Sequence, residues 1–241
     1  MKLEICASNY QSAVNAQQAG AHRIELCTAL VVGGLTPSYG LIKQVLEILQ
    51  IPVFVLIRPR SGNFTYSQDE FESMTNDIQW CKNLGCAGIV SGVLNADNTI
   101  DIERTKELVK LSKPLAFTFH RAFDCTPNPF ETLETLINLG VDRVLTSGQE
   151  ASAEKGLDLL KMLQKNANNK LIILPGSGIN YNNAVSFKNS GFKEIHASAT
   201  TLKQVDELPE ISMLNPKFLD ETEDVISDIN HIKSILNAIL P

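Results

Sequence analysis

The chain has 241 residues, of which 44% are hydrophobic and 20% charged, a composition typical of a globular protein with a large core. Its formal net charge is −6 and its 21 lysine and arginine residues are dispersed, which argues against a nucleic-acid-binding protein. No apolar run approaches the roughly 20 residues that a membrane span requires, and no flexible linker divides the sequence. We therefore expect a single domain over residues 1–241, with neither nucleic acid nor membrane as a partner.

The cysteines indicate a cytoplasmic location. They are Cys6, Cys27, Cys81, Cys86 and Cys125, an odd number at wide spacings, which is unlike a disulfide framework. The first residues enter a strand-like run directly, without the charged and apolar segments of a signal peptide. Both features favour a reducing compartment.

Eight short apolar runs alternate with segments of helical periodicity. In chain order, the stretches that contain them are KLEICAS (2–8), QQAGAHRIELC (17–27), IPVFVLIRP (51–59), CKNLGCAGIVSG (81–92), KPLAFTFHR (113–121), INLGVDRVLTSG (137–148), NKLIILPGSG (169–178) and KNSGFKEIHASA (188–199). In every second stretch a glycine separates the end of a helix from the strand: Gly20, Gly85, Gly140 and Gly191. These are predicted to be residues just after a helix C-terminus, where a left-handed backbone favours glycine.

Alternation of strand and helix, repeated eight times, predicts an α/β fold, namely a single (β/α)8 TIM-type barrel. A doubly wound open sheet uses the same alternation, but this chain lacks the glycine-rich first turn of a dinucleotide-binding fold. The last stretch, residues 220–240, has apolar residues at helical spacing and is predicted to be the closing helix. These residues are Val225, Ile229, Ile232, Ile235, Leu236 and Ile239.

Polar side chains gather where the predicted strands end, the edge at which active sites of such barrels lie. His120 ends an apolar strand and is followed by Arg121 and Asp124, so we interpret His120 as an acid or base whose tautomer a partner fixes. Glu25, near the end of the second strand, is a further catalytic candidate. The alternative is that His120 is a hydrogen-bonded core residue.

The other three histidines divide by position. His196 ends the predicted eighth strand and is a second candidate for the site. His22 precedes a strand, at the opposite face of the barrel, and His231 lies in the closing helix. Both are predicted to be structural.

Two loops offer groups that bind anions. Gly176, Ser177 and Gly178 follow the seventh strand, and Asn180 is predicted to cap the next helix, so backbone N–H groups could cradle a phosphate together with Ser198. Arg58 and Arg60 follow the third strand and could clamp a carboxylate or phosphate. The alternatives are a tight turn and a solvated rim. The loop over residues 61–63 is a candidate mobile lid.

Cys6 and Cys27 end the first two strands and are candidate ligands of a soft metal such as Cu(I). Neighbouring strands lie about 4.8 Å apart, which brings thiols within reach of one ion. Against this, a free cysteine is often a small buried hydrophobe, and the stagger of a barrel could separate the two sulfurs.

Other enzyme classes are excluded by what the strand ends lack. No lysine ends a predicted strand, so a Schiff-base aldolase would have no nucleophile in the expected place. The sequence contains neither H-x-H nor H-E-x-x-H, the spacings of common hydrolytic zinc sites.

Six motifs, taken in order, resemble the CutC family of copper homeostasis proteins: AGAHRIELC, GGLTPS, VFVLIRPRSGNF, FTFHRAFD, DRVLTSG and LPGSGI. The resemblance covers residues 3–198 and implies a TIM-type barrel, a cytoplasmic homodimer, a role in copper handling and Cu(I) binding through Cys6 and Cys27. The chain departs from the usual family pattern at Asn63, where a carboxylate is common, at Ser177 and at Ala7. The tail after Thr200 matches poorly.

Two functional hypotheses follow. In the first, the protein binds copper through Cys6 and Cys27. In the second, it is an enzyme for a small phosphorylated or carboxylated metabolite, with His120 as acid or base and the arginines and strand-seven glycines as the anion site.

Overall fold

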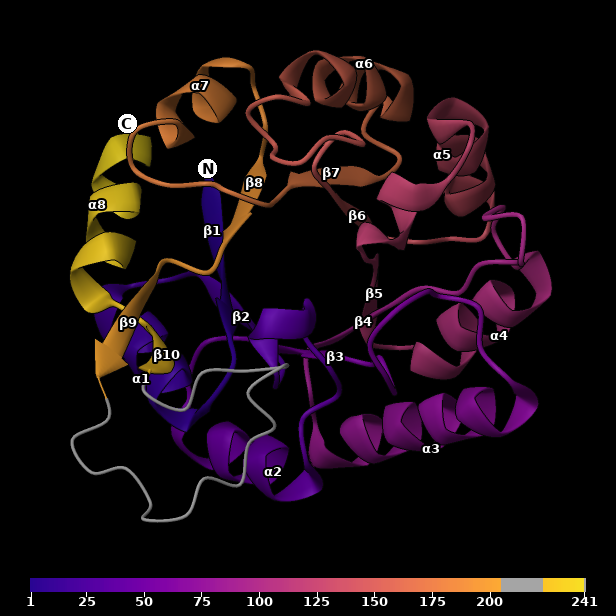
Figure 1. Cartoon of the computed structure of the whole chain (residues 1–241), viewed down its shortest axis with the longest axis horizontal. Coiled ribbons are helices and arrows are strands. Elements are labelled where there is room, and N and C mark those ends of the chain that lie inside the picture. Colours follow the sequence, from indigo (N-terminus) through magenta and orange to yellow (C-terminus); the bar gives the residue numbers. More distant parts are fainter. Residues whose placement is uncertain (205–222, 241) are drawn as a thin grey trace.

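The computed structural model describes residues 1–204 and 223–240 and has a ring of eight strands surrounded by helices (Figure 1). The barrel strands are β1 (Lys2–Ala7), β2 (Arg23–Leu26), β3 (Val53–Leu56), β4 (Gly88–Ser91), β5 (Ala116–Phe119), β6 (Arg143–Thr146), β7 (Ile172–Pro175) and β8 (Glu194–Ala197). The helices are α1 (Tyr10–Ala19), α2 (Tyr39–Ile48), α3 (Gln68–Leu84), α4 (Ile102–Ser112), α5 (Pro129–Asn138), α6 (Leu157–Ala167), α7 (Ala184–Asn189) and α8 (Ile229–Ile239). Two 3₁₀ helices, η1 (Leu30–Val32) and η2 (Arg121–Cys125), follow β2 and β5.

The strands form a nearly closed barrel. Neighbours pair in parallel from β8 through β1 to β7, and β7 and β8 are in contact at the remaining seam. This arrangement confirms the predicted TIM-type barrel and rules out the open sheet, whose edge strands would lie far apart. All eight strands run in one direction, so their carboxyl ends gather at one mouth.

Local sequence signals set the helix ends. Gly20 and Gly85 follow α1 and α3 with φ of 93° and 83°, a left-handed conformation that costs other residues energy. The other two predicted glycines, Gly140 and Gly191, are also left-handed. At the other end of α3, Ser67 and Glu70 form a capping box.

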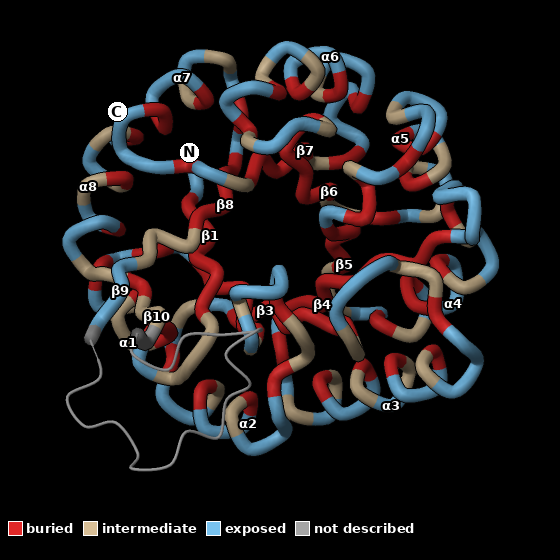
Figure 2. Tube along the Cα trace, viewed as in Figure 1, coloured by how far each residue is buried: buried red, intermediate tan, exposed pale blue. Residues whose placement is uncertain are grey.

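The core lies between the barrel and the inner faces of the helices (Figure 2). Helix α3 buries the predicted stripe Phe71, Met74, Ile78 and Cys81, while its other face is mostly exposed. No helix within residues 1–204 and 223–240 is long and apolar enough to cross a membrane.

The closing helix begins later in the sequence than predicted. Residues 223–227 form strand β10 (Glu223–Ser227), which pairs antiparallel with β9 (Thr200–Gln204), and α8 begins only at Ile229. Asp228 explains the boundary, because its carboxylate accepts the N–H groups of Asn230 and His231 as an N-cap. The part of the predicted helix over residues 220–222 lies outside the described residues.

Candidate functional site

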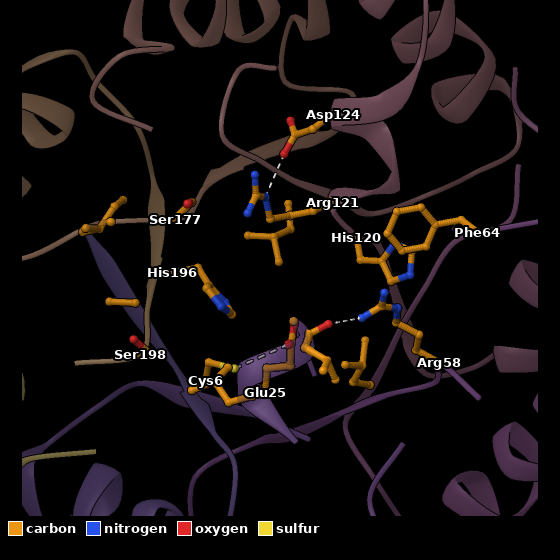
Figure 3. Close-up of a pocket in the computed structure, with 18 of the residues that line it drawn as sticks. Cys6, Glu25, Arg58, Phe64, His120, Arg121, Asp124, Ser177, His196 and Ser198 are labelled. Atoms are coloured by element: carbon orange, nitrogen blue, oxygen red, sulfur yellow. Dashed lines mark hydrogen bonds and ion pairs between the residues drawn. The ribbon is translucent and has the colours of Figure 1, made fainter. Parts of the chain in front are cut away.

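A cavity of about 500 Å³ occupies the mouth of the barrel (Figure 3). Ten of the predicted site residues line it: Cys6, Glu25, Arg58, His120, Arg121, Asp124, Ser177, Gly178, His196 and Ser198. Cys27, Arg60 and Gly176 do not line it. The cavity also takes in residues that the sequence did not single out, chiefly Phe64 and the segment of η1.

The sulfurs of Cys6 and Cys27 converge. Their Sγ atoms lie 3.6 Å apart, and both side chains are buried. Cys27 directly follows β2, and its backbone N–H donates to the carbonyl group of Ala7 at the end of β1. This hydrogen bond holds the ends of the two strands side by side, in spite of the stagger of the barrel. The close Cys27 sulfur, followed by burial, raises the pKa of the Cys6 thiol well above its ordinary value.

Cys6, Glu25 and His196 form a tight cluster beside this pair. One ligand atom from each lies within 4.8 Å of the others, and all three side chains are buried. The strand register produces the cluster: Cys6 pairs with Glu25, and Glu4 pairs with His196 on the other side of β1. A thiol, a carboxyl group and an imidazole therefore meet on one wall of the cavity.

The cluster holds two shifted titrating groups. Burial raises the pKa of Glu25 to about 7, in spite of the nearby charge of His196. Oε2 of Glu25 has no hydrogen-bond partner among the described residues. Burial lowers the pKa of His196, but its interactions with Cys6, Glu4 and Glu25 outweigh that effect and hold the pKa well above the ordinary value. An imidazolium thus lies beside a carboxyl group that titrates near neutral pH.

A buried ion network forms the floor below the cluster. Arg23 pairs with Glu4 and with Glu194, and Arg143 contacts Glu194 at 3.0 Å. The two guanidinium groups also lie over the ring of Phe54, at 5.0 and 5.2 Å from its centroid. Two carboxylates and two guanidinium groups balance each other, which is how a barrel interior tolerates buried charge.

The floor anchors the cluster above it through Glu4. The Nδ1 atom of His196 lies 2.7 Å from Oε1 of Glu4. Burial raises the pKa of Glu4, but Arg23 and His196 outweigh it and lower the pKa to about 2. Glu4 is therefore a fixed negative charge that orients the imidazole. Sequence reasoning did not assign it a role, although the strand period of two places it on the same face as Cys6.

His120 lies on the opposite wall and differs from the predicted acid or base. Its Nδ1 accepts the N–H of Ala122 at 3.2 Å, so the ring proton of the neutral form lies on Nε2. Burial, and then the charge of Arg58, lower its pKa to about 3. A ring held neutral can donate a hydrogen bond, but it does not exchange a proton near neutral pH. Asp124 is not its partner, contrary to expectation.

Arg58 and Arg60 both donate to backbone carbonyl groups of the loops around them. Arg58 is buried and donates to the carbonyl groups of Val32, Gly34 and Gly62, while it lies over the ring of Phe64. It joins the segment of η1 to the predicted lid and places Phe64 against His120, with ring centroids 4.8 Å apart.

Arg60 turns away from the cavity, and the prediction that it clamps an anion there is wrong. Its Nε lies 2.5 Å from Glu70, and its other donors bind the carbonyl groups of Ser61, Asn63 and Thr65. Residues close in sequence satisfy this guanidinium, and none of its donors is left for a ligand at the barrel mouth.

Arg121 is the cation best placed for a ligand. It reaches into the cavity (Figure 3), and Asp124 holds its Nε at 2.8 Å while Ser147 accepts from Nη2 at 3.0 Å. Asp124 also accepts the N–H groups of Ser147 and Gln149. Its role in the structure is to fix Arg121 and the loop after β6.

The strand-seven loop fits the predicted anion cradle only in part. Ser177 and Gly178 line the cavity in left-handed conformations, and Ser198 lines it as well. The N–H of Gly176, however, donates to Thr146 within the barrel, and a Cβ at this position would lie 2.5 Å from Leu145, so packing explains this glycine.

Asn180 does not cap a helix as predicted. The side-chain oxygen of Asn180 accepts the N–H of Asn182 in a turn, and α7 begins only at Ala184. The short helix therefore starts away from the loop that lines the cavity.

The two remaining histidines lie where the sequence placed them. His22 accepts the N–H of Leu3 through Nδ1 at 3.1 Å, at the start of β1, and His231 is exposed on α8. Neither lines the cavity.

Comparison with known proteins gives one consistent result. The family model described as "CutC family" matches residues 1–201. The family protein CutC of Proteus mirabilis is 48% identical over 198 residues, which are 82% of this chain and 79% of that protein. The copper homeostasis protein cutC homolog of Mus musculus is also 48% identical over 198 residues, 82% of this chain and 73% of the relative.

Solved structures agree. A crystal structure of CutC from Streptococcus agalactiae has a TM-score of 0.78 and 34% identity, and the match covers 82% of this chain and 98% of that one. The thiamine phosphate pyrophosphorylase of Pyrococcus furiosus has a TM-score of 0.62 at 13% identity over 99% of this chain and 95% of that one, a likeness of fold alone.

Proposed function

The chain belongs to the CutC family, and we propose that it takes part in copper homeostasis by binding Cu(I) between Cys6 and Cys27. The distance of 3.6 Å between their sulfurs carries the proposal, since two thiolates at this separation can share one soft ion. Of the other three cysteines, Cys81 and Cys86 are buried behind the barrel wall, and Cys125 is exposed where it lines the cavity.

Charge balance supports Cu(I) at this position. Two thiolates and one Cu(I) carry a net charge of −1, which would be costly in a buried site without a counter-charge. His196, held protonated by Glu4 and its neighbours, provides that counter-charge within the same cluster. The carboxyl group of Glu25 lies in the same cluster and is close enough to serve as a further ligand.

Competition with a Cu(I) chelator tests this proposal. Cys6→Ser and Cys27→Ser should each weaken Cu(I) binding by about 100-fold or more, because a hydroxyl is a poor ligand for a soft metal. Cys81→Ser and Cys86→Ser are the controls and should bind as the native protein does, because neither residue lines the cavity. Native affinity in both Cys6→Ser and Cys27→Ser would refute the site.

The size and charge of the cavity favour a second candidate function, an enzyme that acts on a small phosphorylated or carboxylated metabolite. Its volume lies in the range of small-molecule sites. Arg121 would bind the anionic group beside Ser177, Gly178 and Ser198. Glu25, with its pKa near 7, replaces His120 as the group that would transfer a proton.

A thermal-shift screen of phosphate esters and small carboxylates, with sulfate as a reference anion, tests the second function. A ligand that stabilises the native protein should lose its effect with Arg121→Ala and keep it with Arg60→Ala, because Arg60 lies outside the cavity. Equal shifts in both variants, or none with the native chain, would count against an anionic substrate. Rising salt should weaken binding.

We also propose that the protein is a cytoplasmic homodimer, as the family resemblance implies. All five cysteines are free thiols, which fits a reducing compartment. Light scattering on the purified chain measures the oligomeric state, and a monomer at micromolar concentration would contradict the dimer.

A further inference from the structure

A second pocket lies on the outside of the barrel, between α2 and α3. Its volume is about 450 Å³, and its walls are Pro37, Tyr39, Ile42, Asp77 and Trp80. The two helices are neighbours in the outer ring (Figure 1), and none of these residues lines the cavity at the barrel mouth. This pocket has no part in either function proposed above.

Two aromatic rings form a corner of the pocket. Tyr39 begins α2 and Trp80 lies on the exposed face of α3, and their ring centroids are 5.7 Å apart at an interplanar angle of 79°. About half of each side chain is exposed, 51% for Tyr39 and 55% for Trp80. Rings at nearly right angles present two π faces to one ligand, and such faces attract cations.

Asp77 supplies negative charge at the same place. It lies one helical turn before Trp80 and is half-buried, and within the described ranges it forms neither an ion pair nor a side-chain hydrogen bond. The buried carboxylates Glu4 and Glu194 and the nearly buried Asp124 are each paired with an arginine, whereas Asp77, like Glu25 in the barrel, is not. Burial alone raises the pKa of Asp77, and no cation offsets it.

We propose that this pocket binds a small organic cation with a methylated ammonium group, between the rings of Tyr39 and Trp80 and with Asp77 as the counter-ion. The apolar sides of Pro37 and Ile42 suit methyl groups. A guanidinium group fits less well, since five N–H donors would meet one carboxylate and few other acceptors. A metal ion would find one carboxylate and one phenol hydroxyl among these side chains, too few ligands for a metal site.

The chain contains a reporter at the site, because Trp80 is its single tryptophan. Choline is titrated into the full-length protein at constant ionic strength while tryptophan emission is recorded. Its uncharged isostere 3,3-dimethyl-1-butanol is the matched control. We expect a saturable change with choline and binding of the alcohol that is weaker by about 3- to 30-fold, the range of a cation–π contact.

Two variants of pocket residues test whether choline binds in this pocket, so the conclusion does not depend on a single substitution. Asp77→Asn and Tyr39→Ala should each weaken choline binding about 3- to 30-fold, whereas Glu72→Gln, an exposed carboxylate on the same helix, should leave it unchanged. No saturable change, equal binding of the alcohol, or native affinity in both Asp77→Asn and Tyr39→Ala would overturn the proposal. Tryptophan emission that changes with protein concentration but not with added choline would also overturn the proposal. The pocket would then be a contact surface between copies of the chain.

Discussion

Replacing Glu25 with glutamine should make stability less dependent on pH, because burial raises the pKa of this carboxyl group from 4.5 to about 7. Between these two values the folded protein holds a proton that the unfolded chain has released, so the native fold loses stability as pH rises. Each pKa unit corresponds to about 1.4 kcal/mol, which gives a total loss of about 3 kcal/mol by pH 8. The amide of the variant cannot ionise and avoids this loss.

Urea unfolding followed by circular dichroism, at pH 4 and at pH 8, measures the effect. The free energy of unfolding of Glu25→Gln, relative to the native chain, should rise by about 3 kcal/mol between the two pH values. Any fixed cost of the amide cancels in this comparison. Glu107→Gln, an exposed carboxylate on α4, is the control and should show no such rise. A relative stability of Glu25→Gln that stays constant with pH would refute the reasoning.

Three further substitutions test the fold, each by urea unfolding at neutral pH. Arg23→Met should cost about 3–5 kcal/mol, because the buried carboxylates of Glu4 and Glu194 each lose one of their two cationic partners. A loss below about 1 kcal/mol would mean that the floor is not a tight network. Gly88→Ala should cost about 1–3 kcal/mol, since its Cβ would lie 2.5 Å from the ring of Phe54, and unchanged stability would show that the ring moves freely. Ser67→Ala should cost about 0.5–2 kcal/mol through the lost N-cap of α3, while an unchanged midpoint would show that the capping box contributes nothing.

The sequence alone determined the architecture. Strand residues alternate with a period of two and helical residues recur with a period of 3.6, and both periods depend on the local chain. Glycine at a helix end is also a local requirement, so Gly20 and Gly85 marked true boundaries. Where the pattern was ambiguous, as at Val225, a helix was predicted and a strand was found.

The sequence also located the side chains that a barrel gathers at its mouth. Strand ends meet there in every such fold, so position in a strand was enough to select Glu25, Arg121 and Ser198. It could not tell which side chains turn inward. Arg58 and Arg60 are two residues apart, yet one lines the cavity and the other pairs with Glu70.

Tertiary structure alone decided the chemistry of the site. The separation of the Cys6 and Cys27 sulfurs depends on the stagger between β1 and β2, which no local pattern encodes. The charge states of His120 and His196 depend on burial and on groups far away in sequence, so one ring is neutral and the other is an imidazolium. Distances and desolvation arise only when strands remote in the chain pack together, and for that reason the sequence named the residues but not their states.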